Sequence, residues 1–113
     1  MEKMTKKEIF MMYFAAGYLK IFHNSIFKNI TIGILKSVTN VSDHKLILRS
    51  FEDMTTLERQ TYYQYDVYCS TFTGTHEEYA IELMKFINWM LSNGFDVFNA
   101  IEQGFAINQK EVV

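Results

Sequence analysis

The fold class of this chain depends on residues 25–51, SIFKNITIGILKSVTNVSDHKLILRSF. Ile30, Ile32 and Ile34 alternate with polar or small residues, which is typical of a β-strand. The segment from Lys45 to Arg49 has the composition of a second strand facing it. This pattern predicts a β-hairpin within residues 28–50.

The same stretch also fits a helical period. Ile26, Ile34 and Val38 share one helical face, while Lys28 and Lys36 lie opposite. Serines are available as N-caps on either side of this segment. The β-branched residues favour strand, whereas periodicity and capping favour helix. We therefore expect helix here and keep the β-hairpin as the alternative.

The flanking sequence predicts helices that begin at capping boxes. The pattern Thr-x-x-Glu occurs at Thr5, Thr55 and Thr75, and in each case the threonine and glutamate can satisfy each other's backbone amides. We expect helices over 5–23, 55–72 and 75–93, and a short one over 96–103. The predicted fold is a mainly α, compact bundle of about five to six helices, with an α+β fold as the alternative. It forms a single domain over 1–113, with a frayed tail at 108–113.

The expected helix over 5–23 has an unusually wide apolar arc. A surface helix needs an apolar stripe of roughly 100°, and here apolar side chains occupy most of the circumference. Such a helix is either central in the core or also packs against another subunit. This observation indicates self-association.

Composition places the chain among globular proteins. It is 49% hydrophobic and 16% aromatic, with 21% charged residues. The single cysteine, Cys69, has no internal disulfide partner, which is compatible with a reducing compartment. The apolar run over 9–19 is shorter than the roughly 20 residues that span a bilayer, and no signal-cleavage pattern follows it. We expect a cytoplasmic protein without membrane contact.

Charges are sorted by halves. Residues 1–49 carry eight Lys or Arg against three Asp or Glu, a balance of +5. Residues 50–113 carry three against ten, a balance of −7. The net charge of −2 hides this asymmetry. Such an asymmetry concerns partners more than fold.

Motifs for catalysis, metals and cofactors are missing from the sequence. It contains no phosphate-binding glycine loop, nucleophile elbow or zinc-protease motif. His23, His44 and His76 have no metal-ligand spacing, with each other or with Cys69. We expect a protein that is not an enzyme and that has no cofactor and no metal site.

Two groups of residues are candidates for binding. Trp89 lies off the apolar face of its expected helix, next to Phe86, and Trp is enriched at interface hot spots. The acidic half places carboxylates among tyrosines. The partner-binding candidates are Trp89, Phe86, Glu78, Glu82 and Asp66, and the basic-patch candidates are Lys6, Lys7, Lys20, Lys28 and Lys36.

These observations predict a small non-enzymatic helical protein that binds a protein partner or forms a homo-oligomer. The alternative is an acidic-surface inhibitor of a nucleic-acid-processing enzyme, as a phage or mobile-element accessory protein would be. A third hypothesis is nucleic-acid binding through the Lys-rich half. The isoelectric point of about 5.9 and the scarcity of arginine argue against it.

Overall fold

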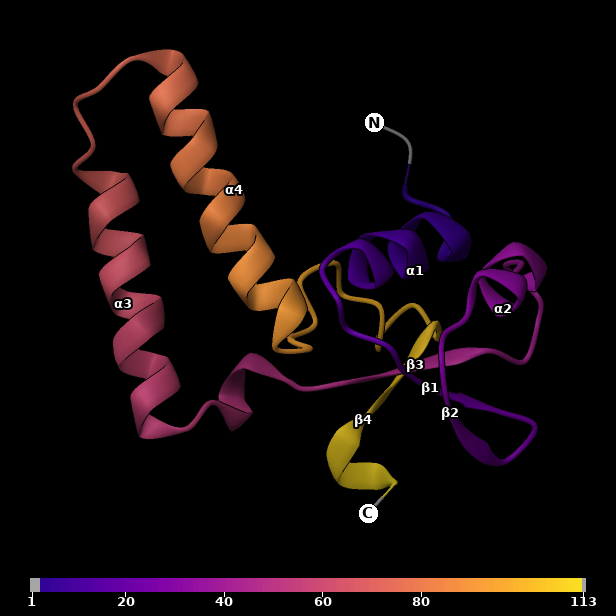
Figure 1. The fold of residues 1–113 in the computed structure, drawn as a ribbon. Helices are drawn as coiled ribbons and strands as arrows, with labels where there is room; N and C mark the ends of the chain where they lie inside the picture. The colour runs from indigo at the N-terminus through magenta and orange to yellow at the C-terminus, as the bar shows by residue number, and fades with distance from the viewer. Residues whose placement is uncertain (1–2, 113) are drawn as a thin grey trace.

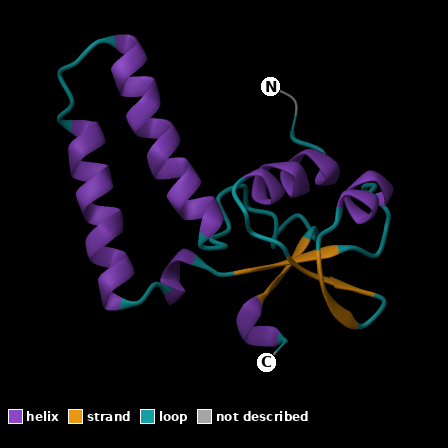
Figure 2. Ribbon diagram, in the orientation of Figure 1, coloured by secondary structure: helices purple, strands orange, loops and turns teal. Residues whose placement is uncertain are grey.

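A four-stranded sheet, two short helices beside it and a long helical hairpin make up the molecule (Figures 1 and 2). The protein is seen in a computed structural model, which describes residues 3–112. The chain is α+β, so the expected helix bundle is wrong and the alternative class is the one observed. The elements are α1 (Lys6–Ala15), β1 (Lys20–His23), β2 (Ile26–Asn29), α2 (Ile32–Ser37), β3 (Lys45–Leu48), the 3-10 helix η1 (Phe51–Asp53), α3 (Thr56–Ser70), α4 (His76–Ser92), β4 (Ala106–Asn108) and the 3-10 helix η2 (Gln109–Glu111).

The sheet has the strand order β2-β1-β3-β4. β1 pairs antiparallel with both β2 and β3, and Ile21 lies opposite Leu46. β3 pairs parallel with β4, and Leu46 lies opposite Ala106. A parallel pair requires a long crossover connection, and here the crossover contains α3 and α4. The hairpin is thus an insertion between two neighbouring strands.

The expected helix over 5–23 is wrong in its second half. α1 ends at Ala15, and the chain turns at Gly17 with φ +87°. Glycine adopts this left-handed conformation without a steric cost. The next apolar residues form β1 instead. The wide apolar arc arose because a helix and a strand were placed on one helical wheel.

The expected helix over 25–51 is also wrong, and the observed strands differ from the alternative hairpin. Asn24 and Ser25 both have positive φ, 52° and 61°, and join β1 to β2 in a two-residue turn. α2 follows, capped by Thr31, whose side chain accepts from the Ile34 amide at 3.1 Å. β3 then pairs with β1 rather than with β2.

The core lies between α1 and the sheet. Tyr13 is buried, and its hydroxyl donates to the Phe95 carbonyl and accepts from the Val97 amide at 3.1 Å. The Tyr18 hydroxyl donates to the Ile47 carbonyl. The Tyr13 bonds fasten the segment after α4 to α1, and the Tyr18 bond fastens the loop between α1 and β1 to β3. The buried aliphatic and aromatic side chains of the core include Ile9, Phe10, Tyr13, Ile21, Ile30, Val38, Leu46, Leu48 and Leu91.

The C-terminal segment differs from expectation. Residues 96–104 form turns rather than the expected helix over 96–103. The Asp96 carboxylate holds these turns by accepting from the amides of Ala100 at 2.6 Å and Ile101 at 3.2 Å. The expected frayed tail, 108–113, begins in β4 and continues into η2; residue 113 lies outside the described part.

Candidate functional site: the helical hairpin

The α3–α4 hairpin projects from the rest of the molecule (Figure 1). Both helices begin where the capping pattern predicted. The Thr55 hydroxyl accepts from the Glu58 amide at 3.1 Å, and the Glu58 carboxylate accepts from the Thr55 amide at 2.8 Å. Thr75 likewise accepts from the Glu78 amide at 3.2 Å. α4 ends before Gly94, whose φ is +76°.

Aromatic rings fill the space between the two helices. Phe86 stacks on Tyr65 with ring centroids 5.2 Å apart, and it meets the edge of Tyr62 at the same distance. The centroid of the Trp89 ring lies 5.9 Å from that of Tyr65 and 5.8 Å from that of Phe95. The structure therefore places Trp89 and Phe86, two partner-binding candidates, in the packing of the hairpin itself, where both are half-buried.

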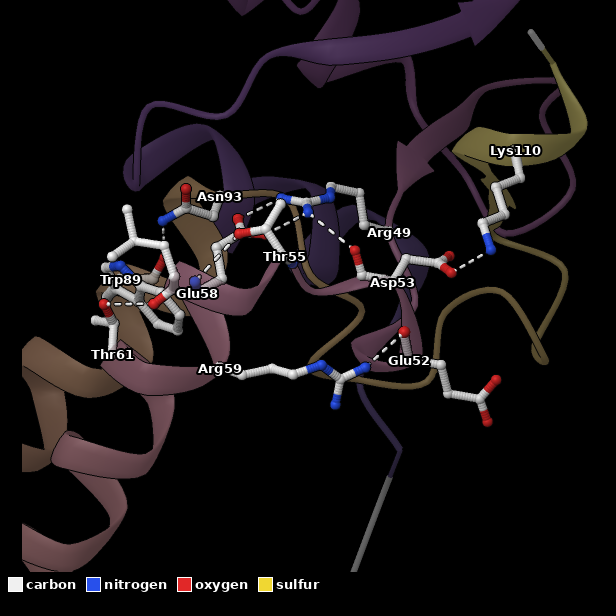
Figure 3. A network of polar contacts seen from close by, with 11 residues as sticks. Arg49, Glu52, Asp53, Thr55, Glu58, Arg59, Thr61, Trp89, Asn93 and Lys110 are labelled. Carbon is white, nitrogen blue, oxygen red and sulfur yellow. Dashed lines mark hydrogen bonds and ion pairs between the residues drawn. The ribbon is translucent and has the colours of Figure 1, made fainter.

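A polar network joins the base of the hairpin to the sheet (Figure 3). Arg49, which follows β3, donates to both carboxylate oxygens of Glu58, at 2.7 and 2.6 Å. Its guanidinium also lies 4.5 Å from the centre of the Phe95 ring. The hydrogen bond from Arg49 lowers the pKa of Glu58 to about 2. This bidentate pair fixes the first turn of α3 to the sheet.

Further contacts surround this pair. The Arg49 amide donates to the Gly94 carbonyl at 2.8 Å, and the Asp96 amide donates to the Arg49 carbonyl at 3.0 Å. Lys110 forms an ion pair with Asp53, so the C-terminal segment also contacts this junction. Both ends of the hairpin are thereby attached to the body by directional bonds.

The outer surface of the hairpin carries many large apolar side chains. Within Thr56–Ser70 and His76–Ser92, the buried side chains are Cys69, Met90 and Leu91. Two facing helices cover only their inner sides, so the remaining apolar residues face outward. The exposed ones are Leu57, Tyr63, Val67 and Tyr68 on α3, and Ile81, Met84 and Ile87 on α4.

A shallow groove runs along one side of the hairpin. It has a volume of about 350 Å³ and is lined by α3 and by one carboxylate of α4. Leu57, Thr61, Gln64 and Tyr68 recur at intervals of four, three and four residues, which is the spacing of a helix-packing stripe. We call these four residues the α3 stripe. Three of them line the groove, together with Tyr65 and Glu82.

The acidic candidates gather on the outer part of the hairpin. Residues 64–82 carry four carboxylates and no Lys or Arg. Asp66 and Glu78 are exposed, and Glu82 accepts from Lys85 at 3.1 Å. The acidic half of the sequence is thus concentrated, in part, at the tip that lies farthest from the body.

The basic candidates come from four elements, and one of them is not on the surface. Lys6 is buried, 1% exposed, and its ammonium donates to the Ser42 carbonyl at 2.6 Å. Burial lowers the pKa of Lys6 to about 8. The Lys7 ammonium donates to the Lys36 carbonyl at 2.9 Å. The other candidates are on β1 (Lys20), β2 (Lys28) and α2 (Lys36).

The fold brings two histidines together that no sequence spacing predicted. The rings of His23 and His44 stack with centroids 3.8 Å apart. The His44 ring nitrogen Nδ1 lies 2.9 Å from the Ser42 hydroxyl. Burial, and next the neighbouring His23, lower the pKa of His44. Among the described residues, no three His, Cys, Asp or Glu side chains are grouped as metal ligands.

Comparisons with protein-family models, curated proteins and solved structures find no match for this chain. Within residues 3–112, no helix combines the length and apolar character needed to cross a membrane. The functional interpretation therefore depends on the hairpin surface and on the chemistry of its residues.

Proposed function

We propose that this is a small non-enzymatic binding protein that acts through protein–protein contacts made by the α3–α4 hairpin. The observation that carries the proposal is the set of large apolar side chains that the hairpin leaves exposed. Large exposed apolar surfaces on folded proteins mark interaction sites. A projecting pair of amphipathic helices offers such a surface to a partner.

The α3 stripe is the part of this surface that best fits a partner protein. Leu57 and Tyr68 are exposed at its two ends, and the groove lies between the stripe and α4. Tyrosine combines a large apolar ring with a polar hydroxyl, and for this reason it is enriched at protein interfaces. Uncharged Thr61 and Gln64 separate the two apolar ends and add hydrogen-bonding groups.

Affinity capture with mass spectrometry tests this proposal. The full chain is compared with Tyr68→Glu on the stripe and with Val41→Glu, which changes an apolar residue that is 95% exposed on the body. We expect the wild type and Val41→Glu to capture the same partner proteins, and Tyr68→Glu to lose them. Identical partner sets for all three proteins would contradict the role of the hairpin.

The concentration of carboxylates supports a second candidate function. Four carboxylates without an intervening cation, at the tip of a projecting arm, suit a basic groove of a nucleic-acid-processing enzyme. Capture at low and high salt separates the two candidates, because contacts between exposed charges weaken as salt increases. Partners that persist at high salt would favour apolar contacts.

A further inference from the structure

We infer that the stacked rings of His23 and His44 form an acid-sensitive latch, which holds residues 39–44 on the body at neutral pH and releases them below about pH 6. These residues connect α2 to β3. The latch is on the body and not on the hairpin, so it operates independently of the proposed function.

Residues 39–44 contact the start of α1 through Lys6. The Lys6 amide donates to the side-chain oxygen of Asn40 at 2.9 Å, and the Lys6 ammonium donates to the Ser42 carbonyl at 2.6 Å. Lys6 is buried, and a buried ammonium requires such an acceptor. The position of the segment is therefore coupled to the burial of a cation.

The same segment contacts the hairpin of β1 and β2. The Asn24 amide donates to the Asp43 carboxylate at 2.9 Å. The neighbouring residues, His23 and His44, stack with an angle of 15° between their ring planes. His44 is only 5% exposed. A change in the charge of either ring therefore acts directly on the attachment of the segment to the sheet.

The Ser42 hydroxyl determines where the neutral His44 ring carries its proton. This hydroxyl donates to the Thr39 carbonyl at 2.9 Å and accepts from the Thr39 amide at 3.0 Å. Because a hydroxyl has one proton and two lone pairs, it can only accept from Nδ1 of His44. Nδ1 is thus protonated in the neutral ring, and acid adds a second proton at Nε2.

The surroundings of His23 fit a neutral ring. Its Nδ1 atom is buried and forms no hydrogen bond with the part of the chain that the structure describes. A protonated Nδ1 would be a buried donor without an acceptor, which costs free energy. The neutral ring avoids this cost by carrying its proton on Nε2. An imidazolium has protons on both nitrogens, so it does not fit the closed latch.

Charged groups around the pair also bear on its protonation. Burial is the main cause of the lowered pKa of His44, and the neighbouring His23 is the next. Asp43 is the carboxylate that faces this cluster, and it acts in the opposite direction. The cations that face the cluster from α1, β2 and β3 are Lys6, Lys28 and Lys45. Charging both rings would add two cations in direct contact with each other, and charges at such short range repel strongly.

The direction of the pH effect follows from these contacts. In the closed latch both rings are neutral, whereas a solvated histidine takes up a proton at about pH 6.5. Below this pH the open form therefore binds more protons than the closed form, so acid shifts the equilibrium towards release. At pH values well above it, neither form is protonated at the histidines and the latch stays closed.

NMR relaxation of the ¹⁵N-labelled full chain, between about pH 7.5 and 5, tests the latch. The backbone order parameters of residues 39–44 should fall from about 0.85 to below about 0.6. The amides of α3 and α4 should keep their shifts, which distinguishes local release from unfolding. In the wild type, the ring signals of His44 should titrate with the same midpoint as the amides of the segment.

Substitutions assign the release to the pair. The double variant His23→Phe with His44→Phe retains two stacked rings that take up no proton, so its segment should remain ordered at about pH 5. His76→Phe is the matched control, because His76 begins α4 and is exposed; it should release like the wild type. If the double variant is already loosened at neutral pH, the midpoints of ring and amide signals in the wild type decide. A segment that stays ordered in the wild type at the lower pH, different midpoints, equal release in the double variant, or simultaneous changes in α3 and α4 would overturn the inference.

Discussion

The ion pair between Arg49 and Glu58 should stabilise the fold by an amount that depends on pH. The pKa of Glu58 falls from its ordinary 4.5 to about 2 because Arg49 donates to its carboxylate. At 1.36 kcal/mol for each pKa unit, this corresponds to about 3 kcal/mol. The Glu58 side chain is 17% exposed, and solvent screening reduces the contribution of such a pair. We expect about 1 to 2 kcal/mol at neutral pH.

Glu58→Gln isolates this charge effect. Glutamine at the same position retains the capping box, since its side-chain oxygen also accepts from the Thr55 amide. The substitution thus removes the negative charge while the helix cap remains. Glu8→Gln is the matched control, because Glu8 occupies the same capping position on α1 and its carboxylate is exposed. We expect a clearly smaller loss for the control.

The pH dependence follows from the direction of the pKa change. The folded-state pKa of Glu58 is below its unfolded value, so the stabilisation is complete above about pH 4.5 and is lost as the pH falls towards 2. Urea denaturation followed by circular dichroism measures the difference between wild type and Glu58→Gln at about pH 7 and pH 3. The difference should shrink markedly at the lower pH. An equal difference at both pH values, or an equal loss for Glu8→Gln, would refute the reasoning.

Three further predictions concern the body of the fold. Tyr13→Phe should lower the free energy of unfolding by about 1 to 2 kcal/mol, because it removes two buried hydrogen bonds and leaves the Phe95 carbonyl and the Val97 amide bonded only to each other; Tyr63→Phe, at an exposed position, is the control in urea denaturation. Gly94→Ala should destabilise more than Gly104→Ala, since both glycines have positive φ but an added Cβ meets a tyrosine ring only at Gly94; equal melting temperatures would contradict this. The free energy of unfolding of the wild type should rise between about pH 8 and 10. The pKa of Lys6 is about 8 in the folded state and 10.5 in the unfolded state, so the unfolded state binds more protons in this range. Lys6→Met should not show this rise when denaturation is measured as a function of pH.

Local sequence signals were enough to place the long helices. Thr55 and Thr75 start α3 and α4 because capping depends on residues three positions apart, and the structure confirms both starts. Their ends also lie within about two residues of expectation. These elements are long and periodic, which is where sequence patterns are most reliable.

The sheet was expected only as the alternative, a β-hairpin within residues 28–50, and its actual strands were missed for physical reasons. Its strands have three or four residues each, too few to establish an alternation. The turn at Asn24 and Ser25 lacks the glycine that usually marks a two-residue hairpin. The pairing of Leu46 with Ala106 joins residues that no local pattern relates. The fold class depends on pairing between distant segments. The local patterns of a single sequence do not reveal which segments pair.

The candidate site shows the same difference between features set by local sequence and features set by the tertiary fold. Asp66, Glu78 and Glu82 lie on the projecting hairpin because their helices were placed correctly. Lys6 and Lys20 were expected on one continuous helix, which Gly17 in fact interrupts, and the structure buries Lys6. The side chains exposed on α4 also escaped notice, since an apolar helical face is normally assigned to a core. Which part of such a face the fold covers is a tertiary property.

The base and the outer part of the hairpin differ in construction, and the difference bears on binding. The base is held by directional bonds at Arg49 and Gly94 and by buried Leu91. Beyond the base, the helices pack mainly on each other through aromatic rings. A fixed base limits the orientations of the arm before a partner arrives, so less conformational freedom is lost on association. An arm that is rigid where it joins the body and apolar where it is exposed has the properties that a contact surface requires.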